Sequence, residues 1–385
     1  MDRIHITDKK DCCGCTSCAS VCPRQCITMT LDKEGFLYPG IEESLCINCG
    51  LCEKRCPVIH RQDMIGKPLK IYAARNTDEE IRMRSSSGGI FSLLAEQVLE
   101  EGGVVFGARF DNHWEVVHDY TESKDELSAF RGSKYVQSRL GDSFLQVETF
   151  LKTGRTVLFS GTPCQIAGLK LFLHHEYNNL LTVDFVCHGV PSPKVWRRYL
   201  IEKAENRRIH DIDFRSKKEG WKKFSFSLSL LVNESGETVS STSVFYEDIY
   251  MKAFLSDLIL RPSCYACPFK SGRAGSDVTI GDFWGIENIL PEIDDDKGVS
   301  LVLLNNEKSL IYYKKMKART LQISSYEEVV RGNPNIAYSV NRHPNRGRFF
   351  KRLDEASCLE TLITKNLKYS FFYRVKQRIK RELYK

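Results

Sequence analysis

The sequence of 385 residues lacks several features that mark common classes of protein. It has no window of 18 apolar residues, so we expect no transmembrane helix. Its first residues are polar, so we expect no secretory signal. Residues 365–385 hold eight Lys or Arg and one Glu, so this segment alone accounts for the formal net charge of +7. The rest of the chain therefore has no net charge. A near-neutral body offers no basic groove, and we expect no nucleic-acid partner.

Cysteine, in contrast, is abundant. Fifteen cysteines in a chain of this kind indicate a reducing compartment and metal ligation rather than disulfides. We therefore expect a cytoplasmic protein. Eight of the fifteen form two runs of identical spacing, C-x2-C-x2-C-x3-C-P, at residues 12–23 and 46–57.

The two runs have the spacing of bacterial ferredoxins that hold two 4Fe-4S clusters. In such runs three cysteines wrap one cubane, and the fourth, before proline, ligates the other. We therefore expect residues 1–60 to form an α+β ferredoxin-like dicluster module. The expected ligands are Cys12, Cys15, Cys18 and Cys56 for one cluster, and Cys46, Cys49, Cys52 and Cys22 for the other. A zinc site or a disulfide framework fits less well, because zinc sites use paired C-x2-C halves with a longer gap between them.

Strand and helix patterns alternate after a polar linker at about residues 60–70. The strands are predicted at 71–74, 104–108, 156–160 and 180–187, and the helices at 88–101, 140–151, 164–173 and 191–205. This alternation predicts an α/β domain with a mostly parallel sheet, in which ligands bind where the strands end. A β-hairpin is predicted over 224–232 and 237–244.

Two segments of this domain are candidates for holding a cofactor. Ser86, Ser87, Gly88 and Gly89 stand at a predicted helix start, where free N–H groups favour a phosphate. The alternative is an ordinary helix start capped by Ser87. Lys134 and Tyr135 could bind a flavin edge or a diphosphate, or belong to a plain loop. Asp282, between glycines and beside aromatic residues, suits a cofactor wall or a simple turn.

Four further cysteines suggest another cluster. Cys164 and Cys187 both follow apolar strands, and Cys264 and Cys267 form a C-x2-C pair. Four soft thiolates in an iron-rich protein would hold a third 4Fe-4S cluster. The alternative is that Cys164 and Cys187 are buried core thiols while the pair binds nothing or zinc.

The motifs together resemble one known family. Gly161-Thr162-Pro163-Cys164-Gln165, Cys187-His188-Gly189, Cys264-x2-Cys267 and Gly281-Asp282-Phe283-Trp284-Gly285 are similar to the beta-subunit family of coenzyme F420 hydrogenases and dehydrogenases. Ser87-Gly88-Gly89 and Lys134-Tyr135 also stand where that family has them. The resemblance implies an α/β flavin-binding domain, its N-terminal part at residues 70–150 and its C-terminal part at 151–330. It further implies bound FAD with an iron–sulfur cluster beside it.

These inferences lead us to expect an iron–sulfur flavoprotein oxidoreductase. Electrons would pass between 4Fe-4S clusters and FAD. The expected two-electron partner is coenzyme F420 or a similar hydride carrier, and the expected one-electron partner is a small redox carrier or a ferredoxin-like donor. The alternatives are a flavin-dependent reductase of another organic substrate, for example one related to polysaccharides, and a non-catalytic electron-transfer adaptor. Residues 345–385 are expected to form a basic helical tail that either touches an anionic membrane surface or stays solvated.

Overall fold

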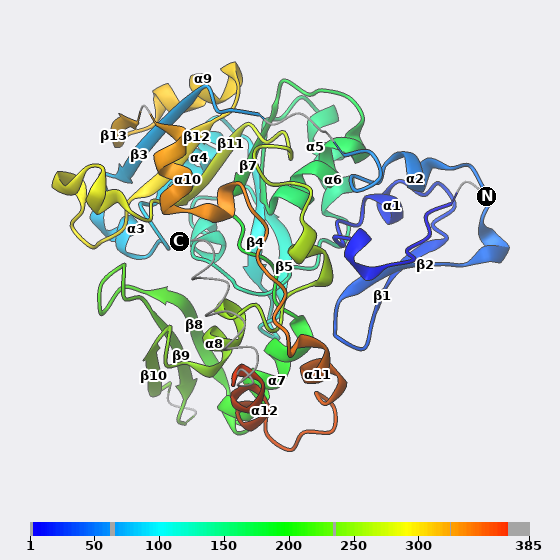
Figure 1. The fold of residues 1–385 in the computed structure, drawn as a ribbon. Coiled ribbons are helices and arrows are strands. Elements are labelled where there is room, and N and C mark those ends of the chain that lie inside the picture. The colour runs from blue at the N-terminus through cyan, green and yellow to red at the C-terminus, as the bar shows by residue number, and fades with distance from the viewer. Residues whose placement is uncertain (1–2, 62–65, 234–235, 324, 369–385) are drawn as a thin grey trace, which may run out of the picture.

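A computed structural model describes residues 3–61, 66–233, 236–323 and 325–368. The N-terminal module stands at one side of the molecule in Figure 1. Its strands β1 (Ile27–Leu31) and β2 (Leu37–Ile41) pair antiparallel. Two short helices, α1 (Ser17–Ser20) and α2 (Leu51–Lys54), lie within the two cysteine runs. Gly35 in the hairpin turn has φ +85°, and a Cβ there would lie 2.3 Å from the Cβ of Lys194. The hairpin turn therefore packs closely against the rest of the protein.

The centre of the molecule is an eight-stranded sheet with the order β13-β3-β12-β11-β7-β6-β4-β5. The strands are β3 (Lys70–Asn76), β4 (Val104–Phe110), β5 (Val116–Thr121), β6 (Val157–Gly161), β7 (Leu180–Phe185), β11 (Val278–Asp282), β12 (Ser300–Leu304) and β13 (Ala318–Ile323). Only β4, β6, β7 and β11 run parallel to one another, and every other neighbouring pair is antiparallel. The prediction of a mostly parallel sheet is therefore wrong, and the sheet is mixed. The reason is that β5 returns from β4 as a hairpin, while β12, β3 and β13 extend the other edge with alternating directions.

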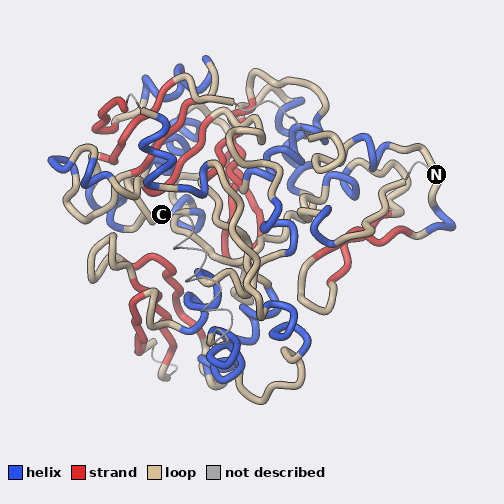
Figure 2. Tube along the Cα trace, viewed as in Figure 1, coloured by secondary structure: helices blue, strands red, loops and turns tan. Residues whose placement is uncertain are grey.

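Helices cover both faces of this sheet, as Figures 1 and 2 show. One face packs against α4 (Ile90–Glu100) and α9 (Glu307–Lys315), and the other against α5 (Ser143–Lys152) and α6 (Pro163–Leu173). Side chains alternate between the two layers along each strand: Val105 packs with α4, while Val104 and Phe106 pack with α5 and α6. Two shorter helices, α3 (Glu79–Met83) and α10 (Tyr326–Gly332), lie near the β13 edge.

A second layer of strands lies below the main sheet in Figure 1. It consists of β8 (Ile209–Ser216), β9 (Ser225–Leu231) and β10 (Thr238–Val244), all antiparallel, so the predicted hairpin is confirmed. It shares an aromatic core, built around Trp196, Phe214 and Tyr250, with a group of helices. These helices are α7 (Pro193–Ala204), α8 (Ile249–Leu255), α11 (Arg346–Lys351) and α12 (Leu359–Leu367).

The predicted basic tail is described only in part. Helices α11 and α12 fall within it, whereas residues 369–385 lie outside the described residues. Within the part that the structure describes, no helix is both long and apolar enough to cross a membrane.

Candidate redox site

The structure gathers the eight ferredoxin-type cysteines around two cavities. The first cavity is lined by Cys12, Cys15, Cys18 and Cys56, and the second by Cys22, Cys46, Cys49 and Cys52. Each cavity therefore has three thiols from one run and the fourth from the other, which is the predicted grouping. The thiols surround the cavities; among the described residues, no three His, Cys, Asp or Glu side chains form a site for a single metal ion.

The thiols of the first cavity suit a cationic group. Burial, followed by the nearby thiols of Cys12 and Cys56, raises the pKa of Cys18 to about 12. A group of buried thiols can become thiolates together only when a cation compensates their charge. The donor set and its enclosure thus fit a thiolate-bound iron–sulfur cluster.

A third cavity lies between the module and the α/β part, and all four remaining candidate thiols line it. Cys164 stands in the first turn of α6, Cys187 follows β7, Cys264 lies in the 3-10 helix Pro262–Ala266, and Cys267 follows that helix. One backbone donor already faces a sulfur atom, since the Val190 N–H donates to Sγ of Cys264 at 3.4 Å. The Thr162 hydroxyl lies 3.1 Å from Sγ of Cys164, where either atom can be the donor.

Burial has the same effect in the third cavity as in the first. Burial, with a smaller contribution from neighbouring thiols, raises the pKa of Cys264 to about 12 and that of Cys267 to about 11. The third cavity therefore fits a 4Fe-4S cluster by its four thiols, by their burial and by the Val190 N–H that faces Cys264.

Two residues that the sequence analysis did not assign connect the first and third cavities. Cys13 is buried and lines both cavities, and its thiol lies close enough to that of Cys164 to affect its pKa. Arg261 lines the third cavity and donates from Nε to the Cys12 carbonyl at 2.8 Å. The only signal in the sequence was position, because Cys13 is adjacent to a predicted ligand and Arg261 lies three residues before another.

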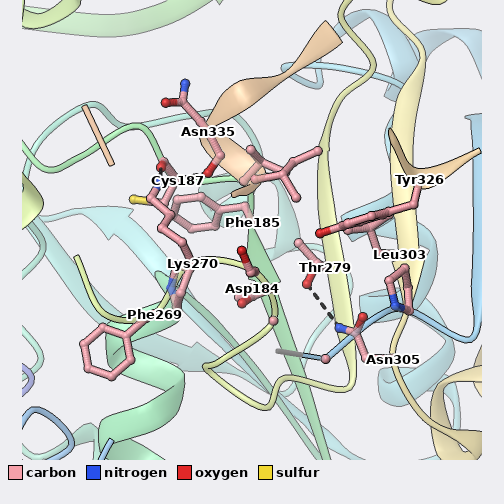
Figure 3. A pocket seen from close by; sticks show the side chains of 17 residues that line it. Asp184, Phe185, Cys187, Phe269, Lys270, Thr279, Leu303, Asn305, Tyr326 and Asn335 are labelled. Atoms are coloured by element: carbon pink, nitrogen blue, oxygen red, sulfur yellow. Dashed lines mark hydrogen bonds between the residues drawn. The ribbon is translucent and has the colours of Figure 1, made fainter. Parts of the chain in front are cut away.

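Figure 3 shows a further pocket, which shares Cys187, Phe269 and Lys270 with the third cavity. Asp184, at the end of β7, is 3% exposed, and Oδ1 has no hydrogen-bond partner among the described residues. Burial raises its pKa from 3.8 to about 7, against the opposing effect of the Thr279 and Ser276 hydroxyls. Lys270 donates from Nζ to the carbonyl oxygen of Cys187 and so ties this pocket to the third cavity.

The serine–glycine segment is packed inside the protein. Helix α4 begins at Ile90 with Gly89 as its N-cap, and the Ser87 hydroxyl donates to the Val299 carbonyl at 2.8 Å rather than capping the helix. A Cβ at Gly88 would lie 2.4 Å from the Ala74 carbonyl oxygen. The close packing of β3 and β12 thus requires a glycine at position 88 whether or not a ligand binds there.

Lys134 lines a large cleft of about 1030 Å³ between β8 and the loop of residues 128–134. The volume matches the upper range of small-molecule sites. Its basic residues are Arg84, Arg131, Lys134, Arg207 and Arg208, and its aromatic residues include Phe110 and Trp114. Burial lowers the pKa of Lys134 to about 7. Three acidic residues, Asp111, Asp211 and Asp213, also line the cleft, so its basic side chains exceed its acidic ones by two. This excess and the aromatic rings suit a ligand that carries negative charge and planar rings.

The other predicted cofactor residues meet behind this cleft, at Arg215. Asp282 binds the guanidinium with two contacts, at 2.9 and 3.1 Å, and the Tyr135 hydroxyl accepts from Nη1 at 3.1 Å. The Ser86 carbonyl accepts from Nη2 at 3.2 Å. Sequence reasoning missed Arg215, because its partners come from three distant segments.

A line of rings leads from the cleft toward the third cavity. Tyr135 follows Lys134 in the chain, and its ring centroid is 4.7 Å from that of Phe254. Phe254 in turn lies 5.1 Å from the imidazole of His188, which lines the third cavity. The Nε2 atom of His188 is 2.7 Å from the Asp257 carboxylate, which orients the ring.

Comparison with known sequences gives three matches along the chain. Residues 11–59 match a profile for a 4Fe-4S dicluster domain. Residues 71–143 and 154–329 match the profiles for coenzyme F420 hydrogenase/dehydrogenase, beta subunit, N-terminal and C-terminal parts, respectively.

Individual relatives cover smaller parts. A ferredoxin 7Fe of Hydrogenibacillus schlegelii is 39% identical over 64 residues, which are 16% of this chain and 76% of that protein. The coenzyme F420 hydrogenase subunit beta of Methanosarcina barkeri is 31% identical over 74 residues, 18% of this chain and 25% of that protein. A chain of the F420-reducing [NiFe] hydrogenase complex from Methanosarcina barkeri superposes with a TM-score of 0.48 and 19% identity, covering 77% of this chain and 96% of that chain.

Proposed function

The chain belongs to the coenzyme F420 hydrogenase/dehydrogenase beta-subunit family, and from this premise we propose that it is an iron–sulfur flavoprotein oxidoreductase. In this proposal three 4Fe-4S clusters pass electrons to or from FAD. Coenzyme F420 or a similar hydride carrier is the two-electron partner. A small redox carrier or a ferredoxin-like protein exchanges electrons with the N-terminal module.

One observation carries the proposal: the third cavity brings Cys164, Cys187, Cys264 and Cys267 together directly beside the first ferredoxin cavity. Cys13 lines both cavities, so the two sites are neighbours. The second cavity includes the exposed Cys49 and lies farther out in the module. The proposed order is therefore second cluster, first cluster, third cluster, flavin.

The large cleft is the proposed flavin site. FAD, when bound, supplies the junction between one-electron and two-electron chemistry. Arg131 and Lys134 would bind its phosphate oxygens, since charged donors on anionic oxygens are strong hydrogen bonds. Phe110 and Trp114 offer flat surfaces for a ring system. The ring line from Tyr135 to His188 supports a position of the flavin within reach of the third cavity.

The choice of F420 as the two-electron partner rests on the family match and on the similarity to the coenzyme F420 hydrogenase subunit beta of Methanosarcina barkeri. The test is anaerobic purification of the full chain, followed by flavin analysis and titration with reduced F420. We expect bound FAD and loss of its oxidised absorbance on titration. Flavin reduced by other donors but not by F420 would instead support the reductase of another substrate. Protein with a full set of clusters and no flavin would support the adaptor.

A further inference from the structure

We propose that Arg261 is the shared counter-charge of the first and third clusters, and that it sets the reduction potentials of both. The inference rests on the proposed function, because the third cluster belongs to it. Arg261 stands where the ferredoxin module meets the α/β part, within contact of the first cluster's loop and in the wall of the third cavity. Nothing in the sequence motifs assigns it a role.

The buried arginines among the described residues show why Arg261 is unusual. Arg82 pairs with Asp295, Arg215 with Asp282, and Arg346 with Glu34. Arg261 is 0% exposed, yet among the described residues no carboxylate forms an ion pair with it. An isolated charge is costly to bury, so a buried arginine needs an anion close by.

The groups around the guanidinium identify that anion. Nε donates to the Cys12 carbonyl at 2.8 Å, and Nη2 donates to the Leu37 carbonyl at 2.9 Å and toward Sγ of Cys12 at 3.6 Å. Nη1 donates to the Gln137 side chain at 3.0 Å. Its strongest electrostatic neighbours are Cys12, Tyr38, Cys13 and Cys264. Cys12 and Cys264 are expected ligands of two different clusters, so among these partners they are the groups that would become anionic when the clusters bind.

Local geometry holds the side chain in this place. The guanidinium carbon lies 4.3 Å from the ring centroid of Tyr38. Gly14 has φ +73°, and a Cβ there would come within 2.9 Å of Nη1 of Arg261. The cysteine loop thus leaves room for the arginine between Cys12 and Cys15.

The charge has a direct effect on electron transfer. A 4Fe-4S core with four thiolates is anionic, and one-electron reduction makes it more so. A fixed positive charge and hydrogen bonds toward the sulfur atoms favour the reduced form, since net charge and hydrogen bonding set cluster potentials. An electron that moved from the first cluster to the third would oxidise the first and reduce the third. Arg261 contacts both sites and keeps its own charge throughout.

The experiment compares Arg261→Gln, which removes the charge and keeps a donor, with Arg261→Lys, which keeps the charge and loses the planar fork. Full-length proteins are purified anaerobically, and each cluster is titrated by EPR-monitored redox potentiometry. We expect Arg261→Gln to lower the potentials of the first and third clusters and to leave the second unchanged. Arg261→Lys keeps the charge, so its potentials are expected to stay close to those of the wild type.

The matched control is the double variant Glu34→Gln with Arg346→Gln, which removes an ion pair at the same boundary without changing the net charge. It is expected to leave all potentials in place. Unchanged potentials in Arg261→Gln, or equal shifts in Gln and Lys variants, would overturn the inference. If Arg261→Gln loses iron, retention in Arg261→Lys supports the charge role, and equal loss in both overturns it. Wild-type protein with only two clusters would reject the third cluster, while the first cluster's potential would still test Arg261.

Discussion

Arg346 and Glu34 form a two-bond ion pair across the boundary between the α/β part and the ferredoxin module, with Nη1 to Oε1 at 3.0 Å and Nη2 to Oε2 at 2.6 Å. Arg346 is 2% exposed, so the pair is largely shielded from water. We expect Glu34→Ala to destabilise the protein by about 3–5 kcal/mol, because it leaves a buried charge without its partner. Anaerobic urea unfolding followed by tryptophan fluorescence measures this loss.

The control for this pair is Glu43→Ala, which removes a partner of Arg3 on the surface of the same module. Exposed pairs contribute about 0–1 kcal/mol, so little change is expected. Equal effects of the two variants would contradict the assigned role of the Arg346–Glu34 pair.

Cross-ligation in the module gives a second prediction. Cys22 follows the first run but lines the cavity of Cys46, Cys49 and Cys52. Cys22→Ser is therefore expected to damage the second cluster and to spare the first, as measured by iron content and EPR. Cys26→Ser is the control. The Cys26 sulfur lies 3.4 Å from the Cys22 sulfur, but Cys26 belongs to neither run. Loss of the first cluster in Cys22→Ser would reject the crossed assignment.

The flavin cleft is tested by Lys134→Met. A hydrogen bond to a charged group contributes about 1.5–3 kcal/mol, so FAD affinity is expected to fall roughly tenfold or more. Iron content is expected to stay constant. Lys152→Met, on the outer side of α5, is the matched control. Gly88→Val is not suitable, because its side chain would collide with the Ala74 carbonyl whether or not a flavin binds. Full flavin occupancy in Lys134→Met would place the flavin elsewhere.

Asp184 gives a pH-dependent prediction. In the unfolded chain its carboxyl releases its proton near pH 4, whereas burial holds its folded pKa at about 7. Between these values the folded state binds one more proton, so this group makes stability fall as pH rises, by up to roughly 1.4 kcal/mol per pH unit. Asp184→Asn removes that penalty. Its stability relative to wild type is expected to be higher at pH 8 than at pH 5, as measured by thermal unfolding, and a pH-independent difference would contradict the account.

The sequence predicted what is encoded locally. The cysteine runs, the β9–β10 hairpin and the strand ends before Cys164 and Cys187 all depend on spacing within short segments, and the structure brings the predicted thiols together. The antiparallel half of the sheet was missed because the pairing of β3 with β12 joins segments more than 200 residues apart. Arg261 was missed for the same reason, since its contact with Cys12 spans 249 residues.

The serine–glycine segment shows a different limit of sequence reasoning. Its composition is that of a phosphate-binding helix start, yet Gly88 is required by the neighbouring backbone of β3 and β12. Small residues permit close approach of a ligand or of another strand equally well, and the sequence alone does not tell which. Lys134, which does line the cleft, had the weaker sequence signal.

The third cluster is the central claim, and the iron content of anaerobically purified full-length protein tests it most directly. We predict about twelve iron atoms per chain, and about eight in Cys267→Ser, with both ferredoxin-type EPR signals retained and flavin reduction uncoupled from cluster reduction. About eight iron atoms in both proteins, with normal flavin reduction by the ferredoxin clusters, would contradict the claim.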